Sequence, residues 1–249
     1  MNLIKSMLSK LTKKKYIYLV RRGNDALKQI VKLLPQKTYL IQDQGGWITY
    51  KQYPKKFKTV KTDFGIMSPK DLAQEEGIVL INSLPGYFAV QPMDEITKVC
   101  KKNNLTLIND ISGSIGTKEA TYGDIIFASC GKDKPINVGY GAFIASNNPL
   151  NINENFDNTY LQSFTEQLLN LKTRLKSLKA YSKNIKTDLN KYKILHKDHL
   201  GINVVIAYTD EKEKNEIIKY CQSNLLEYTL CPRYIRVNTN AISIEVKRR

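Results

Sequence analysis

The stretch LTLINDISGSIGTKEATYGDIIFASCGKDKPINVGYGAFIAS, residues 105–146, contains three apolar segments that predict β-strands. The predicted strands are residues 105–109, 124–128 and 142–146. Asp110 directly follows the first strand, and Ser129 follows the second, ahead of a segment that holds Lys132 and Lys134. Because ligands of open α/β sheets bind just beyond the carboxyl ends of the strands, we expect the aspartate and a lysine to face one ligand.

A carboxylate and an amine that face one ligand are the two groups that pyridoxal 5'-phosphate requires of a protein. The carboxylate holds the protonated ring nitrogen of this cofactor, and the amine forms a Schiff base with it. The stretch therefore predicts a pyridoxal-phosphate site at this edge of the sheet.

Basic residues outnumber acidic residues in this chain of 249 residues. It has 39 Lys and Arg against 23 Asp and Glu, which gives a formal net charge of +16. Such a charge is typical of proteins that bind nucleic acid, but the lysines are spread over the whole chain. We interpret the charge mainly as a solvated basic surface, with binding of nucleic acid or another anionic partner as the alternative.

The sequence lacks the patterns that are typical of membrane proteins and of metal sites. No run approaches about 18 consecutive apolar residues, and lysines interrupt the apolar N-terminal residues, which no small-residue cleavage site follows. The four cysteines lack the spacing of metal ligands, and only two histidines are present. We therefore expect no membrane span, no signal peptide and no metal, together with reduced core cysteines and a cytoplasmic location.

Apolar segments in the first 146 residues predict seven strands, several of which are separated by helical segments. They are residues 16–20, 38–42, 58–64, 77–81, 105–109, 124–128 and 142–146. Alternation of strands and helices is typical of an α/β fold with a mostly parallel sheet. Only the short segment rich in lysine and glycine joins the last two strands, so the seventh strand could run antiparallel.

The sequence pattern changes after Pro149. Residues 151–158 are polar and predict a linker, and residues 160–189 predict a long helix with an apolar stripe. The remainder predicts a small α+β unit, with a helix at 210–223 and strands at 204–208, 227–230, 234–237 and 241–246. We therefore expect a large domain over residues 1–150, followed by the long helix and a small C-terminal domain over residues 151–249.

Two further segments could contribute to a ligand site. A predicted strand leads through Gly23 into a helix at 25–34, and the free N–H groups of a helix N-terminus bind phosphate well. Asn24 or Asp25 could equally serve only as the cap of this helix. Trp47, the only tryptophan, follows a glycine pair beyond a strand, where its ring could lie over a flat cofactor or only pack.

These elements, in this order, resemble the large and small domains of fold-type I pyridoxal-phosphate-dependent transferases, and most closely the DegT/StrS sugar aminotransferases. The resemblance rests on Asp110 and the small residues after it, on Ser129 and Lys134, and on the run at residues 139–142. It implies a three-layer large domain with a mostly parallel seven-stranded sheet that binds the cofactor.

The resemblance also implies roles for individual residues. Asp110 pairs with the pyridinium nitrogen, and Lys134 is the Schiff-base lysine, with Lys132 as the alternative. Trp47 is implied to stack on the cofactor ring. The residues implied to bind the cofactor phosphate are Gly23, Asn24, Asp25 and Ser129.

Four positions depart from the family pattern: Gly113 stands for a glutamine, Ile115 for a histidine, Tyr140 for a glutamate and Asn24 for the threonine of the phosphate turn. We predict an aminotransferase-like enzyme with a small-molecule amino donor and an unidentified keto or aldehyde acceptor, which could be a sugar. Arg233 or Arg236 could bind a substrate carboxylate, or both could be ordinary surface residues. The resemblance further implies a homodimer.

Two other functions stay open on the sequence alone. The departures and the basic charge are compatible with a divergent non-catalytic relative that acts as a partner-binding subunit. The charge is also compatible with a pyridoxal-phosphate enzyme that acts on an anionic or RNA-linked substrate.

Overall fold

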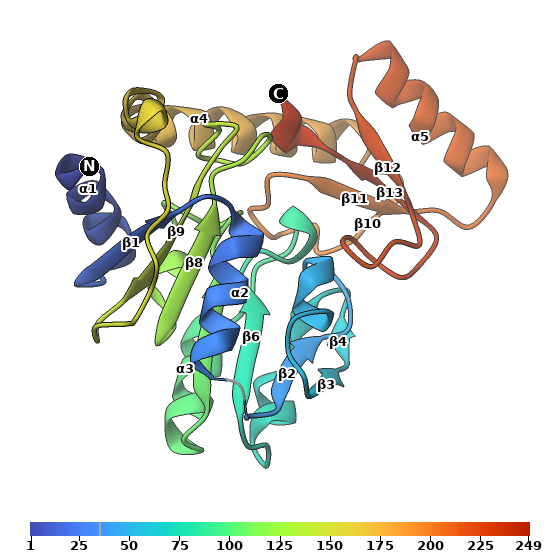
Figure 1. The fold of residues 1–249 in the computed structure, drawn as a ribbon. Helices are drawn as coiled ribbons and strands as arrows, with labels where there is room; N and C mark the ends of the chain where they lie inside the picture. The colour runs from blue at the N-terminus through green and yellow to red at the C-terminus, as the bar shows by residue number, and fades with distance from the viewer. Residues whose placement is uncertain (35) are drawn as a thin grey trace.

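Seven strands form the central sheet of the computed structural model, which describes residues 1–34 and 36–249. The strands are β1 (Tyr16–Val20), β2 (Tyr39–Gln42), β3 (Phe57–Val60), β6 (Ile78–Asn82), β7 (Thr106–Asp110), β8 (Ile125–Ser129) and β9 (Ala142–Ser146). Their order is β1-β9-β8-β7-β6-β2-β3. β9 is antiparallel to both of its neighbours, and the other pairs are parallel. The structure confirms a mostly parallel sheet whose seventh strand runs antiparallel (Figure 1).

Continuous apolar runs place the central strands in the core, because a parallel strand is covered on both faces. In β6, Ile78 and Leu80 face α2 (Gly23–Leu33), whereas Val79 and Ile81 face α3 (Met93–Lys102). The face that α3 covers is extended toward β1 by α1 (Asn2–Thr12) and α4 (Leu161–Asp188). The sheet therefore lies between two helical layers.

The long helix α4 belongs to two apolar cores. Its N-terminal half packs Phe164, Leu168 and Leu171 against the large sheet, and its C-terminal half packs Leu178 and Ile185 against a second sheet. At a rise of about 1.5 Å per residue, a helix of 28 residues spans about 42 Å. This length allows one helix to hold both sheets, as Figure 1 shows.

The second sheet contains four antiparallel strands: β10 (Lys193–Ile194), β11 (Val204–Ala207), β12 (Tyr228–Cys231) and β13 (Ala241–Ile244). Their order is β10-β11-β13-β12. α5 (Glu211–Ser223) packs Ile217 and Cys221 against this sheet. The expected small C-terminal sheet domain is thus present.

One of the predicted strands was wrong, and another was too long. Residues 234–237 form a turn, in which the N–H of Arg233 donates to the Val237 carbonyl (2.7 Å) and the N–H of Arg236 donates to the Arg233 carbonyl (2.8 Å). Proline and asparagine on either side of this apolar segment favour a turn over a strand. The predicted strand 58–64 ends at Val60, and a hairpin of β4 (Thr62–Asp63) and β5 (Ile66–Met67) follows around Gly65, whose φ is +100°.

Short 3₁₀ helices connect the larger elements. They are η1 (Ile48–Lys51), η2 (Pro69–Leu72), η3 (Pro85–Tyr87), η4 (Lys118–Thr121), η5 (Asn158–Tyr160) and η6 (Val246–Arg248). Three of them, η1, η3 and η6, carry residues of the site described below.

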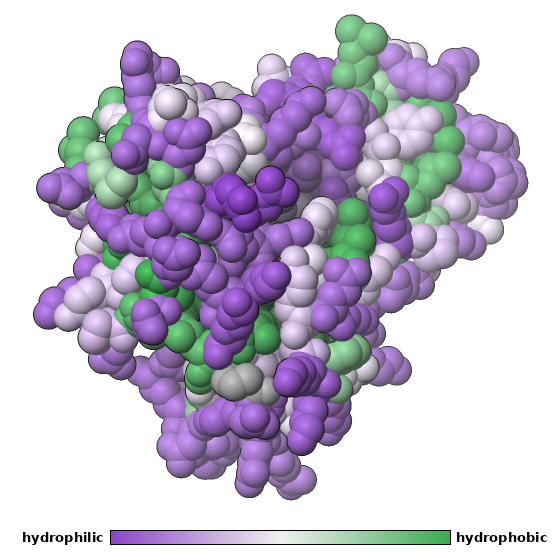
Figure 2. Space-filling model, in the orientation of Figure 1, coloured by the Kyte–Doolittle hydropathy of each residue, from purple (hydrophilic) through white to green (hydrophobic). Residues whose placement is uncertain are grey.

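The surface in Figure 2 is mostly hydrophilic, and its hydrophobic residues form small separate groups. Within the part of the chain that the structure describes, no helix combines the length and the apolar character that a membrane crossing needs. The four cysteines are buried and have free thiols, as expected.

Candidate active site

A cavity of about 410 Å³ opens at the carboxyl ends of β7 and β8, beside the N-terminus of α2. Small-molecule sites usually have volumes of about 300–1,000 Å³. Side chains that the sequence analysis singled out line this cavity: Gly23, Asn24, Trp47, Asp110, Ser129, Lys132, Lys134 and Arg236. A larger cavity, of about 720 Å³, lies near the amino ends of β7 and β8 and is lined by none of these residues. The chemistry therefore points to the smaller cavity.

Asp110 is the last residue of β7, and its carboxylate is held by two hydrogen bonds. One oxygen accepts from the N–H of Ser112 (2.8 Å), and the other accepts from the hydroxyl of Tyr50. Tyr50 is fully buried, and burial, followed by the negative charge of Asp110, raises the pKa of its hydroxyl well above the usual range. Tyr50 therefore stays a proton donor and fixes the orientation of the carboxylate.

Lys134 extends into the cavity from the loop between β8 and β9. Its amine donates a hydrogen bond to the hydroxyl of Tyr87 and lies 4.7 Å from the centroid of that ring. The same amine lies 5.9 Å from the centroid of the Trp47 ring. Lys132 also lines the cavity, but its side chain is exposed. The structure thus holds the amine of Lys134 in place by contacts with two aromatic side chains.

The departure at Gly113 is explained by Tyr87. A Cβ atom at position 113 would lie 2.9 Å from Cδ1 of the Tyr87 ring, which is closer than real Cβ contacts. A glycine is therefore needed for this ring to pack where it does, and a side chain as large as glutamine would displace it. The packing of the Tyr87 ring therefore depends on the glycine at position 113.

The N-terminus of α2 closes another side of the cavity. A Cβ atom at Gly23 would lie 2.9 Å from Cβ of Ser129, so the glycine lets the helix approach the end of β8. Arg22, the N-cap residue, makes no side-chain capping bond within the described residues. Asn24 accepts a hydrogen bond from the Trp47 indole (2.9 Å) instead of capping the helix. The start of α2, at Arg22, Gly23 and Asn24, therefore borders the cavity without a side-chain cap.

Two of the predicted site residues lie outside the cavity lining. The carboxylate of Asp25 accepts a hydrogen bond from the Asn155 side chain (2.9 Å), and its N–H donates to the Arg22 carbonyl (3.0 Å). Arg233 belongs to the turn that replaces the predicted strand, and only Arg236 of the two arginines reaches the cavity wall. Trp47 lies at the cavity with 43% of its surface exposed.

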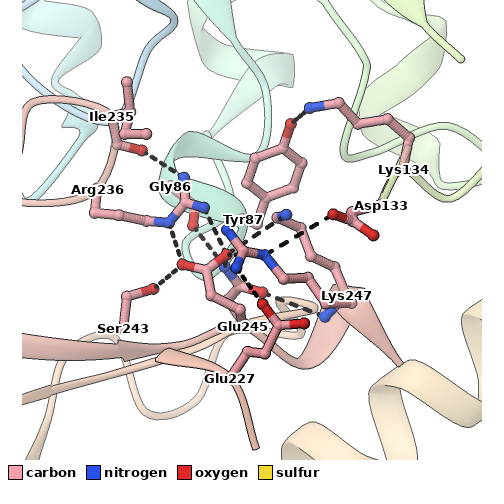
Figure 3. A network of polar contacts seen from close by, with 12 residues as sticks. Gly86, Tyr87, Asp133, Lys134, Glu227, Ile235, Arg236, Ser243, Glu245 and Lys247 are labelled. Carbon is pink, nitrogen blue, oxygen red and sulfur yellow. Dashed lines mark hydrogen bonds and ion pairs between the residues drawn. The ribbon is translucent and has the colours of Figure 1, made fainter. Parts of the chain in front are cut away.

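The C-terminal segment supplies the remaining wall of the cavity. Arg236, Lys247 and Arg248 line it, and the carboxylate of Glu245 lies behind them. Glu245 accepts from Nε (2.7 Å) and Nη2 (2.5 Å) of Arg236, while Nη1 donates to the Ile235 carbonyl (2.9 Å). Figure 3 shows this network directly below Tyr87, with Lys134 on the far side of the ring. The guanidinium of Arg236 is therefore bound within the protein.

Sequence reasoning missed Tyr50, Tyr87, Glu245, Lys247 and Arg248. Tyr87 follows the buried strand β6, so the strand-end argument that selected Asp110 could have found it. Glu245, Lys247 and Arg248 come directly after β13, so they could have been found in the same way. Tyr50 offered no such signal, because its partner Asp110 is 60 residues away in the sequence.

Comparisons with known proteins agree with this architecture. The model of the MJ1341 family C-terminal domain matches residues 172–248, which cover the second half of α4 and the small sheet. No curated protein matches the sequence. A DegT DnrJ EryC1 StrS aminotransferase from Brucella abortus is similar in structure, with a TM-score of 0.74 and 12% identity over 98% of this chain and 84% of that one.

Two further solved structures are similar in fold. A serine palmitoyltransferase variant from S. paucimobilis, with a bound PLP–myriocin aldimine, gives a TM-score of 0.73 at 14% identity over 97% of this chain and 70% of that one. A NifS-like protein from Rickettsia africae gives a TM-score of 0.68 at 16% identity over 98% of this chain and 82% of that one. The fold is that of the fold-type I pyridoxal-phosphate-dependent transferases. At these identities the comparisons carry the fold, and the function must be argued from the site.

Proposed function

We propose that this chain is a pyridoxal-phosphate-dependent enzyme of the aminotransferase type, with the cofactor carried by the amine of Lys134. The observation that supports it most is that Asp110 and Lys134, predicted from two neighbouring strand ends, line one cavity beside the N-terminus of α2. Free N–H groups at a helix N-terminus bind phosphate well, so the start of α2 offers a phosphate site in the same cavity.

The residues of the cavity fit the three parts of this cofactor. Asp110, held by Tyr50 and Ser112, offers a fixed carboxylate for a protonated ring nitrogen. The N–H groups at the start of α2, with the hydroxyl of Ser129, offer donors for a phosphate group. The ring of Trp47 offers a flat apolar surface at the mouth of the cavity.

The residues of this chain would have the following roles in the reaction. When bound, pyridoxal phosphate supplies an electron sink for the bond cleaved next to the substrate nitrogen. Asp110 would keep a proton on the ring nitrogen, since a carboxylate beside that atom favours its charged form. The amine of Lys134, once released by an incoming amino donor, would move a proton as general base, and the hydroxyl of Tyr87 would hold it within reach.

We further propose a cytoplasmic homodimer with a large domain over residues 1–150 and a small domain over 151–249. Trp47 and Ile48, which are 43% and 48% exposed next to the cavity, form an apolar edge that a second copy could cover. A keto or aldehyde acceptor, such as a sugar, is part of this proposal. Its support is the similarity in fold to the DegT DnrJ EryC1 StrS aminotransferase.

The test is an absorbance titration of the purified protein with pyridoxal phosphate, followed by borohydride reduction and peptide mass spectrometry. We expect a visible absorbance band in the wild type that is lost in Lys134→Ala and retained in Lys132→Ala. The reduced adduct should map to the peptide that contains Lys134. A band that persists in Lys134→Ala and disappears in Lys132→Ala would move the attachment to Lys132. No band in the wild type would contradict the proposal and favour the partner-binding relative.

A further inference from the structure

Another cavity, of about 340 Å³, lies where α4 meets both sheets, and we call it the α4 cavity. Its walls come from the residues around η3, the segment after β7, α4 itself and the loop between β10 and β11. It shares no lining residue with the candidate active site. Its volume is near the lower end of the range of about 300–1,000 Å³ for small-molecule sites. The α4 cavity is therefore a separate place with room for one small molecule.

Part of the lining of the α4 cavity is apolar. Leu84, Leu175 and Ile202 contribute to it and are only 4%, 7% and 1% exposed. Leu200 also lines the cavity, and 69% of its surface is exposed. An apolar group bound here would cover Leu200 and pack against the buried side chains, which is favourable because it removes apolar surface from water.

Charged groups of both signs complete the lining. They are the carboxylates of Glu119 and Asp198 and the amine of Lys179. In the described part of the chain, none of these three side chains forms an ion pair or a hydrogen bond. Thr117, in the same lining, has a buried hydroxyl that finds no hydrogen-bond partner among the described residues. Since buried polar groups are normally paired, this hydroxyl indicates a partner that comes from outside the chain.

His199 adds a donor whose position is fixed. Its Nδ1 accepts from the N–H of Val90 (2.9 Å), so the neutral ring carries its proton on Nε2. The ring stacks on His196 with 5.0 Å between centroids, and the amine of Lys186 donates to the His199 carbonyl (2.6 Å). Burial, followed by the charges of His196 and Lys186, lowers the pKa of His199 and keeps the ring neutral at pH 7. Nε2 is thus an N–H donor without a partner among residues 1–34 and 36–249.

Three residues of this lining also hold Tyr87 in place. The N–H of Tyr87 donates to the Leu84 carbonyl (3.0 Å), and its carbonyl accepts from the N–H of Ile202 (2.8 Å). Its ring packs in the space that Gly113 leaves. The hydroxyl of Tyr87 accepts from the amine of Lys134, as Figure 3 shows. The lining of the α4 cavity is therefore connected to Lys134 through a single side chain.

We propose that the α4 cavity binds a small zwitterion with an apolar side chain, such as a free amino acid, and that this binding is coupled to Lys134 through Tyr87. The ammonium group of the ligand meets Glu119 and Asp198, its carboxylate meets Lys179 and His199, and its side chain covers Leu200. A ligand with an anionic group alone would face two carboxylates without a cation of its own, and complementary charge is what selects one partner over another. The site itself goes beyond the proposed function, and only the coupling rests on it.

The experiment is a calorimetric titration of the cofactor-loaded protein with N,N-dimethyl-L-leucine, a zwitterion whose tertiary amine cannot form a Schiff base. The variants are Lys179→Met and Glu119→Gln, with Lys176→Met as the control that removes an exposed lysine of α4 outside the lining. We expect the affinity to fall by about tenfold in both cavity variants and to stay unchanged in Lys176→Met, as loss of a hydrogen bond to a charged group predicts. N-acetyl-L-leucine, which has no ammonium group, should bind the wild type at least about tenfold more weakly.

All three variants should keep the Tm of the wild type, because no ion pair is lost in any of them. Equal affinity of the wild type and both cavity variants for the zwitterion would overturn the site, as would the absence of binding to the wild type.

The coupling is measured by repeating the titration without pyridoxal phosphate and with Tyr87→Phe. Because linkage between two sites is reciprocal, we expect the affinity of the loaded and unloaded wild type to differ by about fivefold or more, and the difference to vanish in Tyr87→Phe. Equal affinities in the loaded and unloaded wild type would overturn the coupling and leave the site. If no visible cofactor band forms but the zwitterion still binds through Lys179, the proposed function and the coupling fail while the site stands.

Discussion

The amine of Lys134 donates a hydrogen bond to the hydroxyl of Tyr87, and Tyr87 in turn packs where Gly113 leaves space for its ring. Lys134 comes from the loop after β8, Tyr87 from η3 and Gly113 from the turn after β7. The three segments meet only at the carboxyl edge of the sheet. This contact explains why a position that is a glutamine in the resembling family is a glycine in this chain.

Replacing Tyr87 by Phe should slow transfer without preventing cofactor attachment. The change keeps the ring and removes only the acceptor for Lys134, so we expect about a tenfold lower kcat, the usual effect of one lost hydrogen bond. The measurement is kcat and KM with an amino donor found by screening. Tyr181→Phe, at an exposed position, is the matched control and should leave both constants unchanged. A wild-type kcat in Tyr87→Phe would remove Tyr87 from the mechanism.

Replacing Asp110 by Asn should separate cofactor attachment from catalysis. The amide keeps the shape of the side chain and can still accept from Tyr50, so the visible band on Lys134 should form. The neutral side chain no longer favours a proton on the ring nitrogen, and we expect transfer to fall by about 10²-fold or more. Single-turnover kinetics with the loaded protein would measure this. Transfer at the wild-type rate would show that Asp110 has another role.

Replacing Gly23 by Ala should weaken cofactor binding and stability together. The new Cβ would lie 2.9 Å from Cβ of Ser129, so the start of α2 must move away from β8. Such overpacking typically costs about 1–3 kcal/mol. Gly131→Ala is the matched control, because its Cβ would meet only Oγ of the same serine at 3.4 Å, an ordinary contact. The measurements are the Tm and the affinity for pyridoxal phosphate of both variants. Equal losses in the two variants would argue against a close approach of α2 to β8 at Gly23.

Replacing Glu245 by Gln should destabilise the protein in a pH-dependent way. Burial by itself raises the pKa of Glu245, but its hydrogen bonds with Arg236 and the nearby charges outweigh burial and hold the pKa at about 2. Because this value lies below the usual 4.5, the carboxylate contributes stability above that pH and loses the contribution as the pH falls toward 2. Leaving Arg236 without its buried partner should cost about 3–5 kcal/mol near neutral pH.

The measurement is the Tm of wild type and Glu245→Gln between neutral pH and the lowest pH at which both stay folded. The difference in Tm should be largest near neutrality and should shrink on acidification. Glu211→Gln, at an exposed position of α5, is the control and should show a small difference at every pH. A difference that does not change with pH would contradict the role of the ionised carboxylate.

The sequence by itself determined most of the helices and strands of this protein and indicated two residues of its candidate site. The runs that became β6, β7 and β8 are continuous and apolar, and local patterns of this kind survive in the fold because burial on two faces demands them. Asp110 and the segment with Lys132 and Lys134 were selected because strand ends of one sheet share an edge, a rule that needs no coordinates, and the family resemblance favoured Lys134 over Lys132.

Only the tertiary structure decided which side chains complete the site. Tyr50 and Tyr87 are 60 and 47 residues away in sequence from their partners Asp110 and Lys134, and these contacts depend on how η1 and η3 are oriented over the sheet. Residues 234–237 have the composition of a strand and form a turn, in which Arg236 pairs with Glu245 of the segment after β13. Local patterns report burial, whereas pairing between distant polar groups is settled by packing.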